Sequence, residues 1–487
     1  MPDERVSATY VVVGGGIAGV SCAECLSYLA SDEPVLLISA SPLIKTVSRI
    51  QQVTQLLEEL DVEEKPMETL MQNHKNLSVI SDKIVKLNSK ERTLLTASGA
   101  IIEYEKLCIA TGGKPKIISE LNEFVIGIRD TETTQTLQKK LSAAKRVVVV
   151  GNGGIATELV YEIENCRVIW VIKDKSISAT FFDPGAAEFF LPNLSTEKAE
   201  ENNIAKRMKY TIAGFKSKVD ASLHGSALGP DWATGLKMSG DSKTTTRNVE
   251  VQYSCEVETV LSYDEFKTEG LKETIFDSED AKWPVYVRLT NGKIFGCDFI
   301  VSATGVTPDC DVFLKDNEFA VSEDGALKVD SKMETSIKNI FAAGDVCNCS
   351  WELPHHWFQM RLWTQARQMG CYVAKCLIAS VENTDVSLDF CFEMFTHVTK
   401  FFGFKVVLLG LFNGQKLGTD YDIILRMTKG KEYIKLVMQN GRIQGAILIG
   451  ETDLEETFEN LILNQMDLSR YGENLLDPNI DIEDYFD

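Results

Sequence analysis

Three glycines near the start of the chain have the spacing of a phosphate-binding turn. Gly14, Gly16 and Gly19 follow the β-branched and aromatic run Thr9–Val13 and precede the apolar stretch Ile17–Ala30. The spacing G-x-G-x-x-G allows a tight turn, a close approach of a pyrophosphate to the backbone and close packing of the next helix on the strand. A helix that begins there directs free N–H groups at an anion. We therefore expect a dinucleotide site at Gly14, Gly16, Ile17, Ala18 and Gly19.

The strand expected after this helix ends where a ribose contact belongs. Residues 34–38 are an apolar run that completes a βαβ unit. An acidic side chain about 20 residues beyond the glycines usually binds a ribose hydroxyl. Ser39 stands there instead. Because serine can still donate or accept one hydrogen bond, we expect a weaker ribose contact rather than the loss of the site.

A second strand, glycine turn and helix follow further along. Residues 146–150 (RVVVV) lead into Gly151, Gly153 and Ala156 at the spacing G-x-G-x-x-A. Because each such motif binds one dinucleotide, two motifs predict two bound dinucleotides. We expect the second site at Gly151, Gly153, Gly154, Ile155 and Ala156.

The strand that closes the second motif ends in charged residues. Residues 167–172 lead into Lys173, Asp174 and Lys175. Lysines could meet the 2′-phosphate of NADPH, whereas Asp174 lies one residue from the ribose position. The sequence leaves NADH and NADPH both open, with Lys173 as the expected contact.

Three more strands end in glycine turns. Residues 106–110 lead into Ala110, Thr111 and Gly112, and residues 300–304 lead into Gly305. Residues 339–343 lead into Gly344 and Asp345, where a carboxylate could accept hydrogen bonds from hydroxyls of a bound ligand. The further candidate cofactor contacts are Ala110, Thr111, Gly112, Gly305, Gly344 and Asp345.

The rest of the chain predicts a mixture of strands and helices. Residues 40–71 are expected to be a polar helical stretch, because Leu56, Leu57 and Leu60 recur at helical spacing. The polar residues 196–248 are expected to form a partly helical, partly flexible insertion. Further strands are expected at 77–80, 93–96, 249–253 and 285–289, with Asn291-Gly292 as a hairpin turn.

The C-terminal part is expected to be an antiparallel sheet followed by a helix. Alternating apolar runs from residue 401 to 449 are separated by turns such as Asn413-Gly414 and Asn440-Gly441. The acidic tail 467–487 is expected to be a disordered end rather than a partner-binding peptide. Its apolar residues are Leu475, Leu476, Ile480 and Phe486.

Composition excludes some classes of function. The chain has 487 residues, enough for about three domains, and a formal net charge of −21. This charge argues against direct binding to nucleic acid or to an anionic membrane. No run reaches the ~20 apolar residues of a membrane-spanning helix, and residues 1–8 leave no room for a secretory signal. Twelve scattered cysteines suit a reducing compartment, so we expect a cytoplasmic or nuclear protein.

The order of these motifs resembles that of the pyridine nucleotide–disulfide oxidoreductases over residues 8–460. The matching segments are GGGIAG (14–19), ATGGKP (110–115), GNGGIATE (151–158), ATGVTP (303–308) and FAAGD (341–345). The resemblance implies an α/β protein with two Rossmann-like domains, binding FAD and NAD(P)H, and an α+β C-terminal domain. Asp345 would contact the ribityl or phosphate part of FAD. The implied domains are 1–140 with 297–385 for FAD, 141–296 for NAD(P)H and 386–487 at the C-terminus.

The chain departs from this family at the redox cysteines. Residues 39–50, where relatives carry one or two, contain none. Cys22 and Cys25 form the only C-x-x-C, and their helical spacing favours structural thiols facing the sheet. Cys347 and Cys349 follow Asp345 closely, but inert thiols are favoured there too. We predict no metal site.

Relatives without the redox cysteines suggest two catalytic residues instead. In them a lysine and a glutamate pair beside the flavin, and Lys45 and Glu158 stand at comparable places in this chain. An ammonium there would stabilise negative charge on reduced flavin, and a buried carboxylate would keep the ammonium charged. An exposed lysine and a capping acid are the open alternative.

The expected function is an FAD-dependent NAD(P)H oxidoreductase that passes electrons to an unidentified acceptor. One branch of the family also carries an insertion in the nucleotide domain, and that branch is associated with protecting the tRNA ligase complex from oxidation. The resemblance therefore implies oxidative-stress defence and a protein partner. A redox-gated binding protein with little turnover is the alternative, and a monomer and a homodimer both stay open.

Overall fold

The computed structural model describes residues 5–129, 131–194, 238–241, 248–275 and 282–479. These residues form two compact structural units. The first comprises the described residues from 5 to 116 and from 305 to 479, and the second comprises the described residues from 117 to 304. Most of the predicted insertion at 196–248, and the tail residues Ile480 and Phe486, lie outside the described residues. The expected three-domain division stays a prediction.

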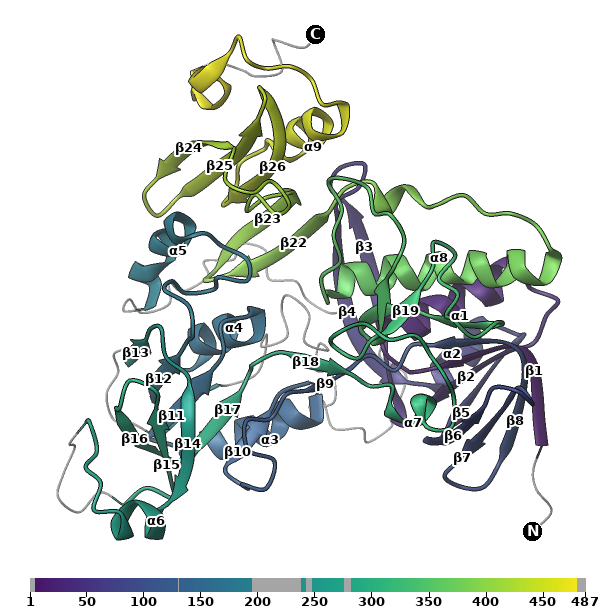
Figure 1. The fold of residues 1–487 in the computed structure, drawn as a ribbon, viewed down its shortest axis with the longest axis horizontal. Coiled ribbons are helices and arrows are strands. Elements are labelled where there is room, and N and C mark those ends of the chain that lie inside the picture. The colour runs from purple at the N-terminus through teal and green to yellow at the C-terminus, as the bar shows by residue number, and fades with distance from the viewer. Residues whose placement is uncertain (1–4, 130, 195–237, 242–247, 276–281, 480–487) are drawn as a thin grey trace, which may run out of the picture. The chain divides into compact units, whose positions relative to one another are not determined.

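A seven-stranded sheet forms the centre of the first unit (Figure 1). Strands β5, β2, β1, β8 and β20 run parallel, and β7 and β6 extend the sheet as an antiparallel edge. The second half of β1 (residues 10–13) and most of β2 (residues 35–38) are continuous buried apolar runs, as expected of parallel strands that are covered on both faces. The strands are β1 (Arg5–Val13), β2 (Val35–Ser39), β5 (Leu77–Ser81), β6 (Ile84–Asn88), β7 (Thr93–Thr96), β8 (Ile101–Ile109) and β20 (Ile340–Ala342).

Two long helices pack against each other on this sheet. They are α1 (Ile17–Leu29) and α8 (Trp363–Glu382). A Cβ at Gly370 would lie 2.4 Å from the carbonyl oxygen of Ala18, so the glycine allows the two backbones to approach. The shorter elements are α2 (Glu68–Asn73), α7 (Asp311–Leu314), β9 (Gly113–Pro115), β18 (Val306–Pro308), β19 (Leu327–Val329) and β21 (Cys347–Cys349).

Residues 40–71 are not the predicted helical stretch. They form an antiparallel hairpin of β3 (Leu43–Gln52) and β4 (Glu58–Pro66), followed by the start of α2. Leu60 and Val62 on β4 are buried with the alternation of a strand, whereas Leu56 and Leu57 lie at the hairpin tip. Both tip residues belong to the hydrophobic core of the C-terminal sheet. Burial in a core distant in sequence therefore overrides the local helical spacing.

A single carboxylate joins the hairpin tip to the C-terminal helix. Glu459 is fully buried, and its Oε1 accepts a hydrogen bond of 3.0 Å from the Leu56 N–H. The Thr54 hydroxyl donates to its other oxygen, and the Leu56 carbonyl accepts from the Thr396 hydroxyl at 3.2 Å. Burial raises the pKa of Glu459, although these hydrogen bonds oppose the shift. Because buried polar groups cost free energy when unpaired, this carboxylate fixes the tip.

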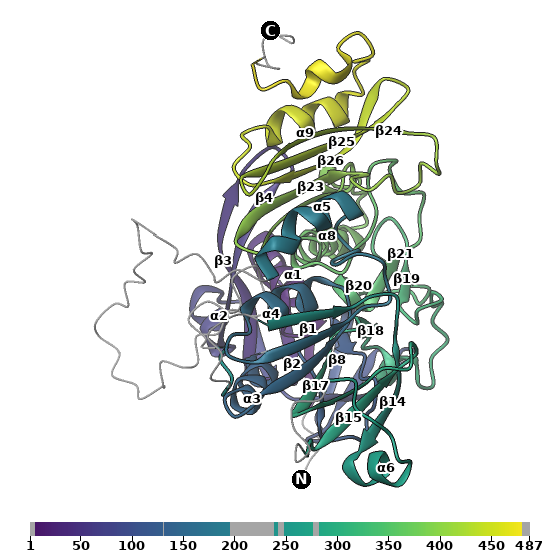
Figure 2. The same ribbon diagram turned by 90° about the vertical axis from the view of Figure 1, so that its left-hand side faces the viewer.

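The predicted C-terminal antiparallel sheet and helix are confirmed. The strand order is β22-β23-β26-β25-β24, and α9 packs on β26 and β23 (Figure 2). The described part of the tail is ordered, contrary to expectation: Leu475 and Leu476 are buried in this core, and the Leu476 carbonyl accepts from Arg426 at 3.2 Å. The elements are β22 (Thr396–Phe401), β23 (Phe404–Gly410), β24 (Asp422–Thr428), β25 (Glu432–Gln439), β26 (Arg442–Ile449) and α9 (Glu455–Asn464).

The second unit repeats the parallel architecture. Its five-stranded sheet has the order β10-β17-β11-β12-β13, and an antiparallel sheet, β14-β15-β16, packs beside it. The hairpin turn predicted at Asn291-Gly292 joins β15 to β16. Its elements are β10 (Val125–Gly127), α3 (Thr131–Leu141), β11 (Arg146–Val150), α4 (Gly154–Glu162), β12 (Arg167–Val171), α5 (Pro184–Phe190), β13 (Asn248–Gln252), β14 (Val257–Ser262), α6 (Tyr263–Thr268), β15 (Val285–Leu289), β16 (Ile294–Cys297) and β17 (Phe299–Ser302).

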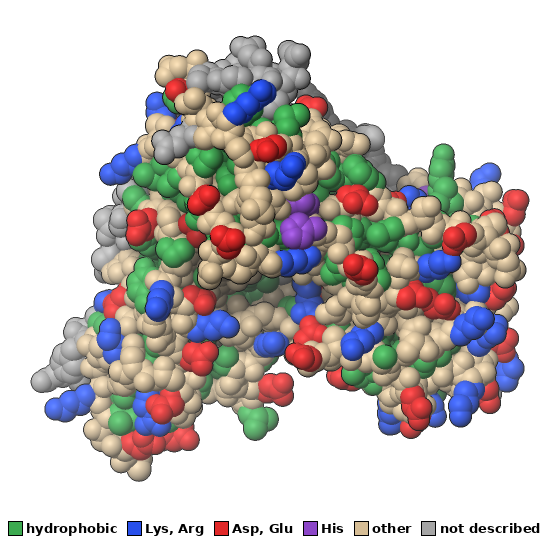
Figure 3. Space-filling view, turned by 45° about the horizontal axis from the view of Figure 1, so that its top comes forward, with side chains coloured by type: hydrophobic (Ala, Val, Ile, Leu, Met, Phe, Trp, Pro, Cys, Tyr) green, Lys and Arg blue, Asp and Glu red, His purple; other side chains and the backbone are tan. Residues whose placement is uncertain are grey.

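Charge is mixed over one face of the molecule. Acidic and basic side chains alternate over the face drawn in Figure 3, with hydrophobic side chains between them. Among the described helices, none is long and apolar enough to cross a bilayer.

Candidate functional site

The first glycine turn has the geometry that its spacing predicts. Gly14 has φ +128°, and a Cβ on it would lie 2.1 Å from the carbonyl oxygen of Ala110. A Cβ on Gly19 would lie 2.0 Å from the carbonyl oxygen of Gly14, so α1 packs directly on the turn. A Cβ on Gly16 would meet no other described atom within 4 Å. Since Gly16 is also the residue before α1, open space lies over the helix N-terminus, and the turn fits a pyrophosphate.

The carboxyl ends of four parallel strands meet at this turn. The Gly14 N–H donates to the Ile38 carbonyl at 2.8 Å, and the Ala110 N–H donates to the Val13 carbonyl at 2.8 Å. The Ala343 N–H donates to the Ile109 carbonyl at 3.1 Å. Cofactors of open α/β sheets bind outside the carboxyl ends of their strands. The structure therefore brings Ala110 and the segment before Gly344 to the predicted FAD turn.

Ser39 and Thr111 lie at this edge of the sheet. The buried Ser39 ends β2, and its Oγ would lie 2.5 Å from a Cβ on Gly15. This hydroxyl accepts a 3.2 Å hydrogen bond from the Ser41 N–H. The Thr111 hydroxyl donates to the Asp309 carbonyl at 2.5 Å, and Gly112 has φ +71°. Both side chains have protein partners, so their contacts with a cofactor stay predictions.

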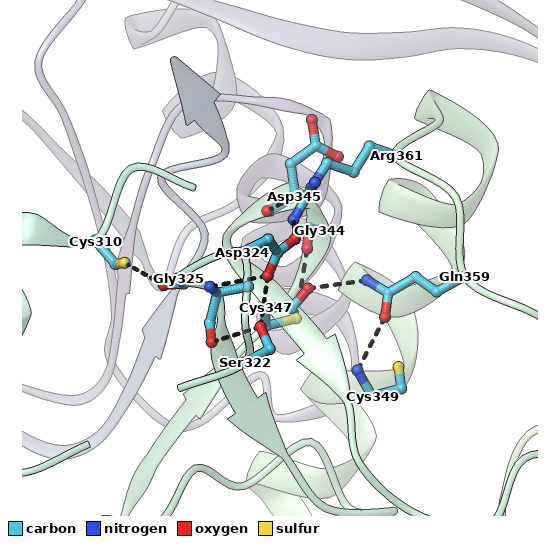
Figure 4. Close-up of polar contacts among 11 residues, drawn as sticks. Cys310, Ser322, Asp324, Gly325, Gly344, Asp345, Cys347, Cys349, Gln359 and Arg361 are labelled. Carbon is cyan, nitrogen blue, oxygen red and sulfur yellow. Dashed lines mark hydrogen bonds and ion pairs between the residues drawn. The ribbon is translucent and has the colours of Figure 1, made fainter. Parts of the chain in front are cut away.

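Gly344 brings the Asp345 turn against α1. Gly344 has φ +78°, and a Cβ on it would lie 2.9 Å from the Ala18 Cβ. The partly buried Asp345 accepts a 3.2 Å hydrogen bond at its carbonyl from Arg361 Nε (Figure 4). Arg361 also pairs with Asp324. The acid predicted to contact FAD is therefore held next to the first turn of α1 by an arginine that the sequence did not single out.

Hydrogen bonds also organise the segment after Asp345. Gln359 accepts from the Cys349 N–H at 2.9 Å and donates to the Cys347 carbonyl at 2.9 Å (Figure 4). Cys347 and Cys349 are both buried, and burial raises the pKa of each thiol. For Asp324, burial acts to raise the pKa, but hydrogen bonds from Ser322 and Arg361 lower it to about 2. Burial and these hydrogen bonds are typical of a structural segment, and the inertness of the two thiols stays a prediction.

The backbone of Lys45 lies next to the first glycine turn. Its N–H donates to the Gly15 carbonyl at 2.8 Å, and its side chain is partly buried. Glu64 on β4 is its cross-strand neighbour and is buried. The sequence did not single out Glu64, because the hairpin that pairs it with Lys45 was predicted as helix. Directly opposed residues of a hairpin lie within interaction distance, so Glu64 is a candidate partner of Lys45.

The second glycine turn repeats the geometry of the first. Gly151 has φ +128°, and a Cβ on it would lie 2.1 Å from the Ala303 carbonyl oxygen. A Cβ on Gly153 would meet nothing within 4 Å among the described atoms. Gly154 and Ile155 begin α4, and the third position, Ala156, is buried. The open space again lies at a helix N-terminus, so this turn also fits a pyrophosphate.

Two residues that the sequence did not single out shape the second turn. Asn152 donates to the Asp174 carboxylate at 2.8 Å and to the Ser176 carbonyl at 2.9 Å. The Trp170 indole donates to the Gly151 carbonyl at 2.7 Å. Lys173, the predicted ribose or phosphate contact, is exposed just before Asp174. Asn152 thus holds Asp174 at the turn. The only feature of the sequence that pointed to Asp174 was its position one residue after Lys173.

The remaining candidates are Glu158, Gly305 and the two cysteines of the C-x-x-C motif. Glu158 lies on α4 in the second unit and is partly buried, whereas Lys45 is in the first unit, so their pairing stays a prediction. Gly305 has φ +100° and accepts from the Lys116 N–H at 2.9 Å. The C-x-x-C residues do not face one another: Cys22 is buried and hydrogen-bonded to Cys108, whereas Cys25 is partly exposed and hydrogen-bonded to Cys371.

Comparisons with known proteins agree with this geometry. The profile of the family "Pyridine nucleotide-disulphide oxidoreductase" matches residues 8–227 and 242–370, and that of the "Rubredoxin NAD+ reductase C-terminal domain" matches 397–466. The chain is 55% identical, over 98% of both chains, to the human "Pyridine nucleotide-disulfide oxidoreductase domain-containing protein 1". It is 46% identical to the Drosophila melanogaster protein of that name, over 98% of this chain and 99% of that one.

Solved structures show the same fold at low identity. A ferredoxin reductase from Rhodopseudomonas palustris superposes with a TM-score of 0.67 at 17% identity, over 98% of this chain and 99% of that one. Putidaredoxin reductase, in its covalent complex with putidaredoxin, superposes with a TM-score of 0.65 at 14% identity, over 98% of both chains. With its two Rossmann-like glycine turns and its C-terminal α/β segment, the chain belongs to the pyridine nucleotide–disulphide oxidoreductase family of flavoproteins, whose cofactors are FAD and NAD(P)H.

Proposed function

We propose that this protein is an NAD(P)H-dependent FAD oxidoreductase in which Lys45 takes the place of a redox cysteine. The observation that carries the proposal is the hydrogen bond from the Lys45 N–H to the Gly15 carbonyl at 2.8 Å, which fixes Lys45 beside the first glycine turn. When bound there, FAD would supply the electron transfer between NAD(P)H and an acceptor. The residues of the chain supply position and charge.

The first turn holds the FAD pyrophosphate in this proposal. The N–H groups at the start of α1 face the open space over Gly16, where an anion is stabilised. The other proposed FAD contacts lie at the same strand ends. They are Gly14, Ile17, Ala18, Gly19, Ala110, Thr111, Gly112, Gly344 and Asp345, and Ser39 is proposed to contact the ribose.

Lys45 supplies a positive charge at the reacting end of the flavin. Burial disfavours a lone ammonium, so a carboxylate beside it is needed to keep Lys45 protonated. Glu64, opposite Lys45 in the hairpin, is one candidate source of that charge, and the pairing with Glu158 stays a prediction. An ammonium fixed in this place lowers the free energy of negative charge that develops nearby.

The second turn binds the nicotinamide nucleotide. The pyrophosphate lies over Gly153 at the start of α4, and Lys173 and Asp174 face the adenosine ribose. Among the described residues, Asn152 donates to one carboxylate oxygen of Asp174, so the other can accept from a 2′-hydroxyl, whereas Lys173 offers charge to a 2′-phosphate. Both NADH and NADPH are proposed as substrates.

The cellular role is proposed from resemblance. Oxidative-stress defence, a partner such as the tRNA ligase complex, and a cytoplasmic or nuclear location stay predictions, as does the alternative of a redox-gated binding protein. The similarity to the human and Drosophila melanogaster proteins over nearly the whole chain supports a role shared with them.

Anaerobic stopped-flow reduction of the purified yellow protein by NADH and by NADPH, followed by admission of air, tests the proposal. Rapid bleaching of flavin absorbance followed by reoxidation supports an oxidoreductase. Reduction over minutes with a long-lived charge-transfer band supports the binding protein instead. If no flavin copurifies and none can be reconstituted, the proposal fails.

The role of Lys45 is tested separately. Lys45→Met is expected to slow flavin reduction and make the flavin reduction potential more negative, while Lys45→Arg keeps both near their wild-type values. The matched control is Lys65→Met on the partner strand, because Lys65 pairs only with Glu63, at 3.3 Å, among the ion pairs of the described hairpin. Equal effects of Lys45→Met and Lys65→Met would exclude a specific role for Lys45.

A further inference from the structure

Three cysteines differ from the rest in exposure. All twelve lie within the described residues and are free, but nine are buried and only Cys25, Cys371 and Cys391 are partly exposed. Cys25 lies on α1 and Cys371 on α8, far apart in sequence. Access to solvent is a first requirement for a thiol that reacts.

The packing of α1 on α8 places the first two together. Gly370 brings the α8 backbone against Ala18 of α1, and Cys371 is the next residue. Cys25 lies on the same side of α1 as Ala18, because a spacing of seven residues is close to two helical turns, so it belongs to the side of α1 that packs on α8. Its thiol is hydrogen-bonded to the sulfur of Cys371. The two sulfurs are therefore neighbours across a helix–helix interface.

Positive charges lie on both sides of Cys371. Arg367 and Lys375 are four residues before and after it on α8, so the three side chains form one stripe on the helix. Arg367 pairs with Glu58 at 2.7 Å, and Lys375 pairs with Asp389 at 2.7 Å. These ion pairs hold both cations in place beside the thiol.

The electrostatics distinguish Cys371 from the other thiols. The hydrogen bond from Cys25 and the charge of Arg367 lower the pKa of Cys371, although burial and Glu58 oppose them. Donating that bond, together with burial, raises the pKa of Cys25. Burial likewise raises the pKa of Cys22 and of Cys391. Cys371 is thus the nucleophile of the pair, since the thiolate is the reactive form.

We propose that Cys371 and Cys25 form an oxidisable thiol pair that hydrogen peroxide converts to a disulfide linking α1 to α8. The Cys371 thiolate attacks a peroxide oxygen, the O–O bond breaks, and a sulfenic acid and one water form. The Cys25 sulfur then attacks the sulfenic sulfur, an S–S bond forms and a second water leaves. Two thiols give up two electrons and two protons to hydrogen peroxide, so the reaction balances.

This chemistry does not pass through the dinucleotide turn. Hydrogen peroxide itself takes up the two electrons, so the reaction needs no electron transfer through a flavin. The oxidant therefore comes from solution, and the pair is distinct from Cys347 and Cys349, which are buried after Asp345.

Limited oxidation of the full-length holoprotein tests the proposal. The reduced protein is treated with one to a few equivalents of hydrogen peroxide, blocked with N-ethylmaleimide, digested without reductant and analysed by mass spectrometry. The expected product is a peptide that joins Cys25 to Cys371, while Cys22 stays reduced. Retained flavin absorbance and circular dichroism show that the protein is still folded.

Variants separate the two steps. Cys371→Ser is expected to abolish the reaction, whereas Cys25→Ser stops it at a sulfenic acid on residue 371 that dimedone traps. Cys391→Ser, the matched control at the third partly exposed cysteine, leaves the cross-link unchanged. Arg367→Gln slows alkylation of Cys371 by about tenfold for each pKa unit that the guanidinium supplies, and Glu58→Gln, which keeps the guanidinium, does not.

Two results would overturn the proposal. One is a folded wild-type protein in which excess peroxide produces no disulfide between Cys25 and Cys371. The other is a wild-type rate of peroxide consumption in Cys371→Ser, which would place the reactive thiol elsewhere. Neither result depends on turnover with NAD(P)H, so the experiment tests the thiol pair independently of the proposed oxidoreductase function.

Discussion

The buried His397 makes the stability of the first unit depend on pH. His397 lies on β22 with its side chain fully buried. Its Nδ1 is 3.2 Å from the Thr364 hydroxyl, and its ring contacts that of Trp363 edge-on, with the centroids 5.1 Å apart. Burial lowers its pKa from 6.5 to about 3. The neutral imidazole is therefore the folded form throughout the physiological pH range.

The lowered pKa of His397 determines the sign and the size of the change in unfolding free energy with pH. Between pH 6.5 and 3 the unfolded chain binds a proton at His397 and the folded chain does not, so stability falls as pH falls. Each pH unit in this window costs about 1.4 kcal/mol. Wild-type protein should thus lose roughly 2 kcal/mol of unfolding free energy at this site between pH 7.5 and pH 5.0, and roughly 5 kcal/mol by pH 3.

Urea unfolding at pH 7.5 and 5.0, followed by tryptophan fluorescence, measures this difference. His397→Gln removes the titrating group and keeps a side chain that can bond to Thr364. The variant should lose roughly 2 kcal/mol less than wild type on acidification, because all other groups titrate alike in both proteins. His355→Gln, at an exposed histidine, is the control. A pH dependence of His397→Gln that matches wild type within about 0.5 kcal/mol would refute the role assigned to burial of His397.

Three further substitutions test other parts of the structure. Gly19→Ala places a Cβ 2.0 Å from a backbone carbonyl, so we expect the purified variant to lose its flavin absorbance, and an unchanged FAD content would contradict the packing of α1 on the turn. Glu459→Gln presents an amide N–H₂ to donors at the hairpin tip and should cost about 2 kcal/mol in urea unfolding, while the exposed Glu456→Gln on the same helix should cost nothing measurable. Arg146→Met leaves Glu273 without its buried partner and should cost about 3–5 kcal/mol, so a loss below 1 kcal/mol would show that water replaces the arginine.

The glycine turns could be predicted because their requirements are local. A positive φ at Gly14 and Gly151, and open space over Gly16 and Gly153, follow from the backbone path between a strand and its helix. The flanking strands could also be predicted, because parallel strands buried on both faces are continuous apolar runs. The motif thus specifies its own geometry without reference to the rest of the chain.

The hairpin could not be predicted because its stability comes from residues distant in sequence. Leu56 and Leu57 have helical spacing, but they are buried against β23, β26 and α9 rather than along a helix of their own. The contact of Cys25 with Cys371 has the same origin: the i, i+3 spacing predicted that Cys22 and Cys25 share one face of the helix, but the packing of α8 on α1, which supplies Cys371, left no signal in the sequence. Side chains that meet through tertiary packing leave no periodic signal in the segment that carries them.

The hairpin also connects the parts of the first unit that bear on chemistry. At its base the Lys45 N–H bonds to the first glycine turn, and at its tip Leu56 is held by Glu459. Next to the tip, Glu58 binds Arg367, the cation that flanks Cys371. The C-terminal helix therefore anchors the tip of the hairpin next to Glu58, although it carries none of the residues proposed to contact a cofactor.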